Sequence, residues 1–131
     1  MNVLIFGATG SLGKPLTQKL IDVGFEITSP SRARCDLDDE QSVLSFMNES
    51  DASRWSIVIF CAGTFGGLRS YVEGPLNVSK FERNFEKLTS WLRNKYWVLI
   101  SSASAIENEH PSSVYYHYAE HKRRIEAVLT G

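Results

Sequence analysis

One stretch near the N-terminus constrains the fold more than any other: the apolar run at residues 3–6 (VLIF) and the turn GATGSLG at residues 7–13. The apolar run predicts a buried strand, and Gly7, Gly10 and Gly13 follow it at the spacing GxxGxxG before a helical pattern begins. Glycines let the backbone approach a ligand closely, and the first amides of a helix attract anions. The stretch therefore predicts a strand, a phosphate-binding turn and a helix, with an ordinary glycine bend as the alternative.

Length and composition set the class of protein. A chain of 131 residues suits one domain, and 43% hydrophobic with 22% charged residues is typical of a globular fold rather than a disordered one. The net charge of -1 gives no general attraction to nucleic acid or to an anionic membrane, and no apolar run is long enough to span a bilayer. With two cysteines, Cys35 and Cys61, and no signal-peptide pattern, we expect a reduced, cytoplasmic protein.

Strand and helix patterns alternate along the rest of the chain. Strands are expected at residues 25–29, 35–37, 56–62 and 97–102, the second of them after an abbreviated crossover. Helices are expected at residues 11–23, 40–47, 79–94 and 114–129, and the long segments 64–77 and 103–113 are expected to be loops. This order predicts a single α/β domain over residues 1–131, a doubly wound, Rossmann-like parallel sheet of about five strands in three α/β/α layers. Ligands bind such sheets beyond the carboxyl ends of the strands.

The motifs, taken in order, resemble those of the short-chain dehydrogenase/reductases, particularly extended and atypical branches such as sugar epimerases and dehydrorhamnose reductases. The resemblance spans the chain and rests on the glycine turn, Asp36-Leu37, Cys61-Ala62-Gly63, Ser101-Ser102 and Tyr118-x-x-x-Lys122. It implies an NADP-dependent oxidoreductase, with NAD as the alternative cofactor, acting on a carbonyl or hydroxyl of a small molecule such as a nucleotide sugar.

The resemblance also implies a catalytic set. Tyr118 would exchange a proton with the substrate oxygen, and Lys122, one helical turn later on the same face, would lower the pKa of the phenol. Ser102, with Ser101 and Ser104 as competitors, would hydrogen-bond the reacting oxygen, and Asn77 resembles the helix asparagine of the family. The alternatives are that Tyr118 merely packs, that Lys122 is solvated, and that Asn77 is a helix cap.

A cofactor-binding set follows from the same resemblance. Arg32, just past the second strand, suggests a 2′-phosphate and hence NADP, and Asp36 would accept from the adenine amino group. The alternatives are an exposed loop arginine and a helix-capping aspartate. The full set is Gly7, Thr9, Gly10, Ser11, Leu12, Gly13, Arg32, Asp36, Leu37, Cys61, Ala62 and Gly63.

Two departures from the family pattern keep other functions open. Cys61 stands where the family commonly has asparagine, and the chain stops at Gly131, whereas family members continue for roughly a hundred residues that supply much of the substrate pocket. We therefore expect the C-terminal substrate-binding part to be absent. The alternative function is a non-catalytic NAD(P)-binding module or truncated remnant. A third is a zinc hydrolase, because residues 117–121 read H-x-x-E-H, although only Glu126 follows as a third ligand.

Partners are expected to be limited to a small-molecule substrate and a second copy of the chain. The helices at 79–94 and 114–129 carry apolar or aromatic positions on more than one face, including Trp91 and Tyr115. Family members commonly dimerise through these helices, so the resemblance implies a homodimer. No metal site, nucleic-acid partner or membrane partner is expected.

Overall fold

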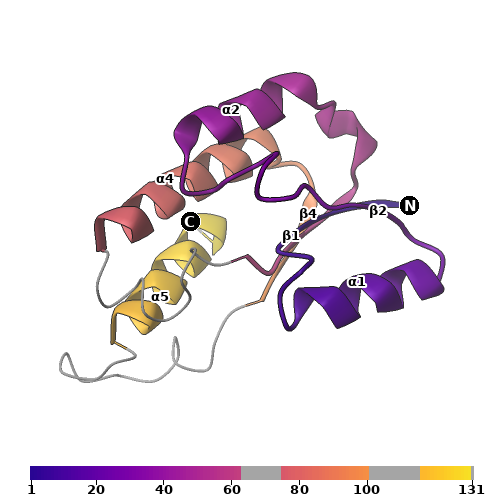
Figure 1. Cartoon of the computed structure of the whole chain (residues 1–131), viewed down its shortest axis with the longest axis horizontal. Helices are drawn as coiled ribbons and strands as arrows, with labels where there is room; N and C mark the ends of the chain where they lie inside the picture. The colour runs from indigo at the N-terminus through magenta and orange to yellow at the C-terminus, as the bar shows by residue number, and fades with distance from the viewer. Residues whose placement is uncertain (63–74, 101–115, 131) are drawn as a thin grey trace.

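Strand β1 (Asn2–Phe6) lies at the centre of a parallel sheet with the order β2-β1-β3-β4 (Figure 1). The computed structural model describes residues 1–62, 75–100 and 116–130, and in the last two ranges the side chains of 79–100 and 120–129. The other strands of this part are β2 (Glu26–Thr28), β3 (Ile57–Phe60) and β4 (Tyr96–Leu99). A central first strand with parallel neighbours on both sides is the arrangement of a doubly wound sheet, so the predicted fold class is confirmed.

The register brings the carboxyl ends of the strands to one edge. Val3 pairs with both Ile27 and Ile57, and β3 pairs with β4 in the same parallel sense. The chain crosses to opposite sides of the sheet after β1 and after β2, so the edge beyond β1 and β3 is the switch point at which such folds bind ligands.

Helices cover both faces of the sheet. Helix α1 (Gly13–Asp22) lies on one face, while α2 (Glu40–Glu49), α4 (Pro75–Trp91) and α5 (Tyr116–Thr130) gather on the other (Figure 1). Alternate residues of β1 explain this division, because Val3 and Ile5 belong to the α1 core whereas Leu4 and Phe6 belong to the larger core under α2 and α4. The three predicted layers are therefore present.

The largest differences from the sequence prediction concern residues 35–37 and the start of α4. The strand expected at residues 35–37 is replaced by turns, in which the Cys35 amide donates to the Ser31 carbonyl at 2.9 Å and the Asp39 amide to the Asp36 carbonyl at 2.9 Å. These local bonds occupy backbone groups that a sheet ladder would need, so the described residues hold four strands rather than five. Helix α4 begins at Pro75, four residues earlier than expected, since proline fits the first turn of a helix. Most of the predicted loops, residues 64–74 and 103–113, lie outside the described residues.

An aromatic cluster fills the larger core. The Phe46 ring lies 6.2 Å from that of Trp55 and 5.9 Å from that of Trp91, and Phe6 meets Phe46 edge to face at 6.1 Å. Trp91 is therefore partly buried against this cluster, while Tyr115 lies outside the described residues. In the part of the chain that the structure describes, no helix is long and apolar enough to cross a membrane.

Candidate functional site

The first and third glycines of the GxxGxxG turn are required by the packing of the protein itself. Gly7 has a φ of +86°, and a Cβ there would lie 2.6 Å from the Ala62 amide nitrogen. A Cβ on Gly13 would lie 1.9 Å from the Gly7 carbonyl oxygen. Any side chain at either position would push apart the ends of β1 and β3 or the start of α1.

Gly10 differs from both. Positive φ among the glycines of the described residues occurs at Gly7 and Gly24, so the backbone of Gly10 is one that other residues adopt. The nearest atom to a Cβ on Gly10 would be the Gly7 carbonyl oxygen at 3.6 Å, an ordinary van der Waals contact. Protein packing alone does not explain this glycine, whereas the close approach of a ligand would.

The N-terminus of α1 is left electropositive. Its N-cap residue, Leu12, supplies no side-chain hydrogen bond, and its first turn carries no acidic residue. Helix α2 is the opposite case, because the Asp39 carboxylate accepts from the Gln41 amide at 3.0 Å and Glu40 sits in the first turn. The positive end of the helix dipole is therefore neutralised in α2 and remains available to an anion in α1.

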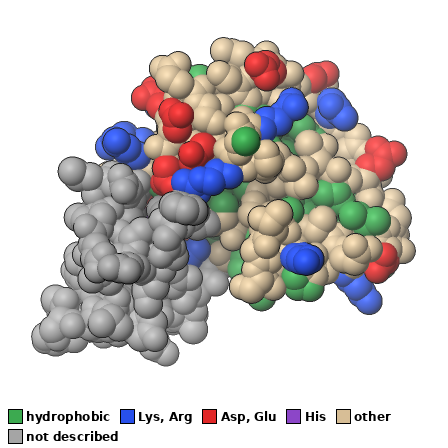
Figure 2. All heavy atoms as spheres, viewed as in Figure 1, with side chains coloured by type: hydrophobic (Ala, Val, Ile, Leu, Met, Phe, Trp, Pro, Cys, Tyr) green, Lys and Arg blue, Asp and Glu red, His purple; other side chains and the backbone are tan. Residues whose placement is uncertain are grey.

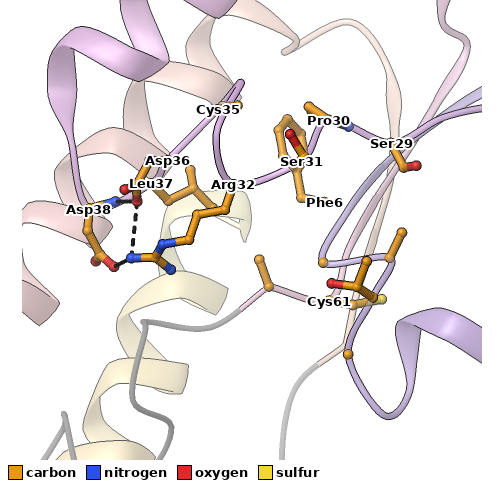
Figure 3. A pocket seen from close by; sticks show the side chains of 15 residues that line it. Phe6, Ser29, Pro30, Ser31, Arg32, Cys35, Asp36, Leu37, Asp38 and Cys61 are labelled. Atoms are coloured by element: carbon orange, nitrogen blue, oxygen red, sulfur yellow. Dashed lines mark hydrogen bonds and ion pairs between the residues drawn. The ribbon is translucent and has the colours of Figure 1, made fainter.

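A cleft of about 420 Å³ opens beside this turn, beyond the carboxyl ends of β1 and β3 (Figure 3). It gathers most of the predicted cofactor-binding residues: Gly7, Thr9, Gly10, Arg32, Asp36, Leu37, Cys61 and Ala62. Phe6, Ala8, Ser29, Pro30, Ser31, Cys35 and Asp38 complete its lining. Acidic and basic side chains intermingle on the face of the molecule in Figure 2, so attraction of an anion to the cleft must come from local groups.

Three predicted cofactor-binding residues adjoin this cleft without lining it. Ser11, Leu12 and Gly13 form the end of the turn and the start of α1, with Leu12 64% exposed and Gly13 buried. Gly63 and Ser102 lie outside the described residues, as do the side chains of Asn77 and Tyr118. Their predicted roles stay predictions.

Arg32 is held at the rim by two carboxylates. Its guanidinium nitrogen Nη2 lies 3.0 Å from Asp38 Oδ2 and 3.4 Å from Asp36 Oδ1, and its side chain points toward both aspartates (Figure 3). Arg32 is thus a half-exposed arginine engaged in ion pairs. The capping alternative for Asp36 is wrong for α2, since Asp39 caps that helix, and Asp36 instead accepts from the Asp38 amide at 3.0 Å.

Asn84 fixes the wall of the cleft and was missed by the sequence reasoning. It is buried in α4, and its amide nitrogen Nδ2 donates to the Leu37 carbonyl at 2.7 Å. A signal was present, because Asn84 stands next to Phe85 and three residues after Phe81, on the apolar face of a predicted helix. A polar residue on a buried face has to find a hydrogen-bond partner.

Lys122 is buried rather than solvated, with 6% of its surface exposed. Burial lowers the pKa of its ammonium, while the charges of Cys61 and Glu126 act in the opposite direction. The same electrostatic contact with Lys122 lowers the pKa of the Cys61 thiol, although burial raises it overall. The charge of Lys122, in α5, therefore acts on Cys61, which lines the cleft just after β3.

Two residues of the H-x-x-E-H segment, Glu120 and His121, bond to other side chains of the protein. The fully buried His121 places Nδ1 3.2 Å from Glu82 Oε2 on α4, and Glu120 pairs with Arg123. Burial lowers the pKa of His121 against the opposing effect of Glu82. Across the described residues, no three histidine, cysteine, aspartate or glutamate side chains are grouped to hold a metal ion, and the side chain of His117, the first residue of the motif, lies outside them.

The pKa of Glu82 is also shifted. Burial raises it, but the hydrogen bonds from His121 and Arg124 and their charges outweigh that effect and hold the pKa below its usual value. Arg124 donates to both Glu82 oxygens. The three side chains therefore tie α5, which carries the predicted tyrosine and lysine, to α4.

Comparison with known proteins agrees with this geometry. Residues 1–64 match the family model described as RmlD substrate binding domain. No curated protein matches the chain. A dTDP-4-dehydrorhamnose reductase from Yersinia enterocolitica shares the fold with a TM-score of 0.76 and 17% identity over 98% of this chain and 47% of that chain.

Two further solved structures show the same fold. The dTDP-4-dehydrorhamnose reductase of Bacillus anthracis in complex with NADP has a TM-score of 0.71 and 22% identity, covering 98% of this chain and 48% of that one. A short-chain dehydrogenase/reductase superfamily protein from Agrobacterium tumefaciens with bound NAD has a TM-score of 0.68 and 15% identity, covering 98% and 44%. The chain spans less than half the length of these structures. The chain is thus similar to the RmlD substrate binding domain family over residues 1–64, in line with the resemblance found in the sequence, and it shares the fold of these structures over nearly its whole length.

Proposed function

We propose that the cleft binds a nicotinamide dinucleotide, NADP or NAD, and that the chain is the cofactor-binding part of an oxidoreductase of the short-chain dehydrogenase/reductase type. The observation that carries the proposal is Gly10, which lines the cleft and which the packing of the protein leaves unexplained. The uncapped N-terminus of α1 beside it supports an anionic ligand, and the structure of the Bacillus anthracis relative is a complex with NADP.

The residues of the cleft fit the parts of such a cofactor. The glycine turn and the first amides of α1 would hold the pyrophosphate, and Arg32 with Asp36 would hold the adenosine end. Cys61 and Ala62, at the end of β3, would then border the nicotinamide end. The site is large enough for these contacts, since the cleft of about 420 Å³ falls within the range of small-molecule sites.

The proposed reaction is the interconversion of a carbonyl and a hydroxyl. The nicotinamide supplies or accepts the hydride when the cofactor is bound. We propose that Tyr118 exchanges the proton with the substrate oxygen, that Ser102 and Asn77 bind and orient that oxygen, and that Lys122 favours the ionised phenol. The burial of Lys122 and its electrostatic interaction with Cys61, a residue that lines the cleft, support its part in this set.

The substrate class follows from the relatives alone. Two of them are dTDP-4-dehydrorhamnose reductases, so we propose a small molecule of the nucleotide-sugar class. The homodimer through α4 and α5 and the cytoplasmic location remain part of the same proposal. Light scattering coupled to size-exclusion chromatography tests the dimer, and a mass of 14.8 kDa would refute it.

Titration with NADPH tests the binding step. We expect saturable enhancement of NADPH fluorescence and a loss of that signal in Gly10→Val, whose side chain would enter the cleft. If the wild-type protein leaves NADPH fluorescence unchanged even when NADPH is well in excess of the protein, cofactor binding is refuted.

Turnover is tested separately from binding. If the proposed reaction is correct, Tyr118→Phe binds NADPH normally but does not oxidise it with nucleotide-sugar and simple carbonyl substrates. Equal binding without turnover in both the wild type and Tyr118→Phe would favour the alternative, a cofactor-binding module without catalysis.

A further inference from the structure

A second cleft, of about 390 Å³, begins where β2 ends. Its other walls are the C-terminal half of α2 and the short 3-10 helix η1 (Ala52–Arg54). Among the described residues, Ser29 and Pro30 are the two that line both this cleft and the one beside the glycine turn. Its volume falls within the range of small-molecule sites. The second cleft is therefore a separate hollow, and its occupation does not depend on a bound cofactor.

The floor of the second cleft holds a buried donor without a partner. Trp55 and Phe46 both line the cleft, and their rings stack at 6.2 Å with an angle of 18° between the planes. Trp55 is 2% exposed, yet its indole nitrogen Nε1 has no hydrogen-bond partner in the described part of the chain. A buried N–H group without an acceptor is costly, and folded proteins rarely leave one. A ligand that brings an acceptor to this nitrogen would remove that cost.

Two arginines give the second cleft local positive charge. Arg34 and Arg54 are exposed residues of its lining, and neither forms an ion pair within the residues that the structure describes. Instead, the Arg34 guanidinium carbon Cζ lies 5.9 Å from the centre of the Phe46 ring. A cation–π contact at an exposed site is weak, so Arg34 can exchange it for a stronger partner. A carboxylate is such a partner, because its two oxygens match the guanidinium group.

Two carboxylates also line the second cleft and limit what it can attract. Asp51 is already engaged, since it accepts from the hydroxyl of Ser53 at 2.7 Å and from the Ser53 amide at 3.0 Å. Glu49 is exposed at the end of α2. Two arginines and two acids leave the lining formally neutral. The second cleft therefore suits a ligand with a single negative charge held by local donors rather than a polyanion.

We propose that the second cleft binds a small aromatic carboxylate. The ring of the ligand replaces the Arg34 guanidinium over Phe46, and its carboxylate accepts from Arg34 and from Trp55 Nε1. Because Nε1 is closed to solvent, the ligand reaches it when Arg34 moves away from the Phe46 ring. This site goes beyond the proposed function, and it holds whether or not the chain binds NADP.

Benzoate is the probe, and the indole N–H signals of the three tryptophans in a ¹H–¹⁵N NMR spectrum are the readout. The signal of Trp55 is identified by its loss in Trp55→Phe. We expect benzoate to move this signal downfield in the proton dimension to a saturating limit, because the N–H gains an acceptor. The indole of Trp97 is an internal control, since its Nε1 already donates to the Leu92 carbonyl at 3.0 Å and should not move.

Matched ligands and variants separate the proposed contacts. Benzamide has the shape of benzoate without its charge, and we expect it to bind at least tenfold more weakly. Arg34→Gln should weaken benzoate binding by roughly three- to tenfold. Arg93→Gln, which removes the same charge from an exposed position outside the second cleft, should leave it unchanged. Trp55→Phe keeps an aromatic ring but lacks the donor, and it should weaken benzoate at least tenfold in calorimetric titration.

Several results would overturn the proposal. They are an unchanged Trp55 signal, equal affinity for benzamide and benzoate, and equal effects of Arg34→Gln and Arg93→Gln. Displacement of benzoate by one equivalent of NADPH would place benzoate in the first cleft and overturn it too. If Trp55→Phe does not fold, the two arginine variants and the Trp55 signal of the wild type still decide the matter. A protein that binds benzoate in this way but not NADPH would retain the second site and lose the proposed function.

Discussion

The contrast between Gly10 and Gly13 gives the sharpest test of the proposed cofactor site. Both belong to one turn, but a methyl group at Gly13 would lie 1.9 Å from the Gly7 carbonyl oxygen, and one at Gly10 would lie 3.6 Å from the same atom. We therefore expect Gly13→Ala to damage the fold and Gly10→Ala to damage only ligand binding.

The size of each effect follows from the structure. Forcing a methyl group into a closed site costs about 1–3 kcal/mol, and for 131 residues at about 2.1 cal/mol/K each, 1 kcal/mol corresponds to about 3–4 °C in Tm. Gly13→Ala should lower the Tm by roughly 4–11 °C. Gly10→Ala lowers the conformational entropy of the unfolded chain, so it should leave the Tm unchanged or raise it by up to about 4 °C.

Binding should show the opposite order of effects. A methyl group on Gly10 would stand between the turn and the pyrophosphate, and losing one hydrogen bond to a charged group costs about 1.5–3 kcal/mol, which is roughly a 10- to 150-fold loss of NADPH affinity. Thermal unfolding followed by circular dichroism and NADPH titration of the same samples measure both quantities. A Gly10→Ala protein that folds and binds NADPH as the wild type does would refute the reasoning.

Three further predictions concern single side chains. NADPH should protect Cys61, which lines the cleft, from alkylation as measured by mass spectrometry. Cys35 should react neither with nor without NADPH, because burial raises its pKa to about 12. Equal labelling of Cys61 with and without NADPH would contradict this. Because burial lowers the pKa of His121 from 6.5, the unfolded chain binds its proton more readily, so the free energy of unfolding should fall as the pH decreases through that value. His121→Gln should flatten that slope in urea titrations between pH 7 and about pH 5.5, and an unchanged slope would count against it. Asn84→Ala should lower the free energy of unfolding by about 1–3 kcal/mol, because it leaves the buried Leu37 carbonyl unpaired. The control Asn94→Ala, at an exposed position, should not. Equal Tm values for the two variants would refute this role of Asn84.

Much of the fold could be predicted because the sequences of the central strands have a clear apolar pattern. The apolar runs in β1 and β3 are continuous, as expected of strands covered on both faces, and the glycine turn marks where β1 ends. The segment at residues 35–37 was predicted wrongly, since three residues carry too little pattern to tell a strand from a turn. Their conformation is set by local hydrogen bonds that Ser31 and Asp36 accept from backbone amides.

The candidate site was predictable only in part for a similar reason. Sequence order places Arg32 and Asp36 beside the cleft, but it says nothing of whether they pair with each other, and the contact with Asp38 depends on the geometry of the turn. The helical pattern of the sequence could not predict the burial of Lys122 either, because that burial depends on how α5 packs in the fold. Tertiary packing, rather than local preference, decides these features.

The parallel pairing of β1 also bears on how the chain folds. The first strand is synthesised first, yet its partner β3 lies more than fifty positions later, at Ile57–Phe60, and β2 offers it only three paired residues in the meantime. Closing so long a loop costs entropy before any contact compensates, and sheets built this way fold slowly. We therefore expect the glycine turn to acquire its shape late in folding, when β3 docks and brings Ala62 against Gly7. The proposed cofactor binding should then recover at the same rate as the chain refolds.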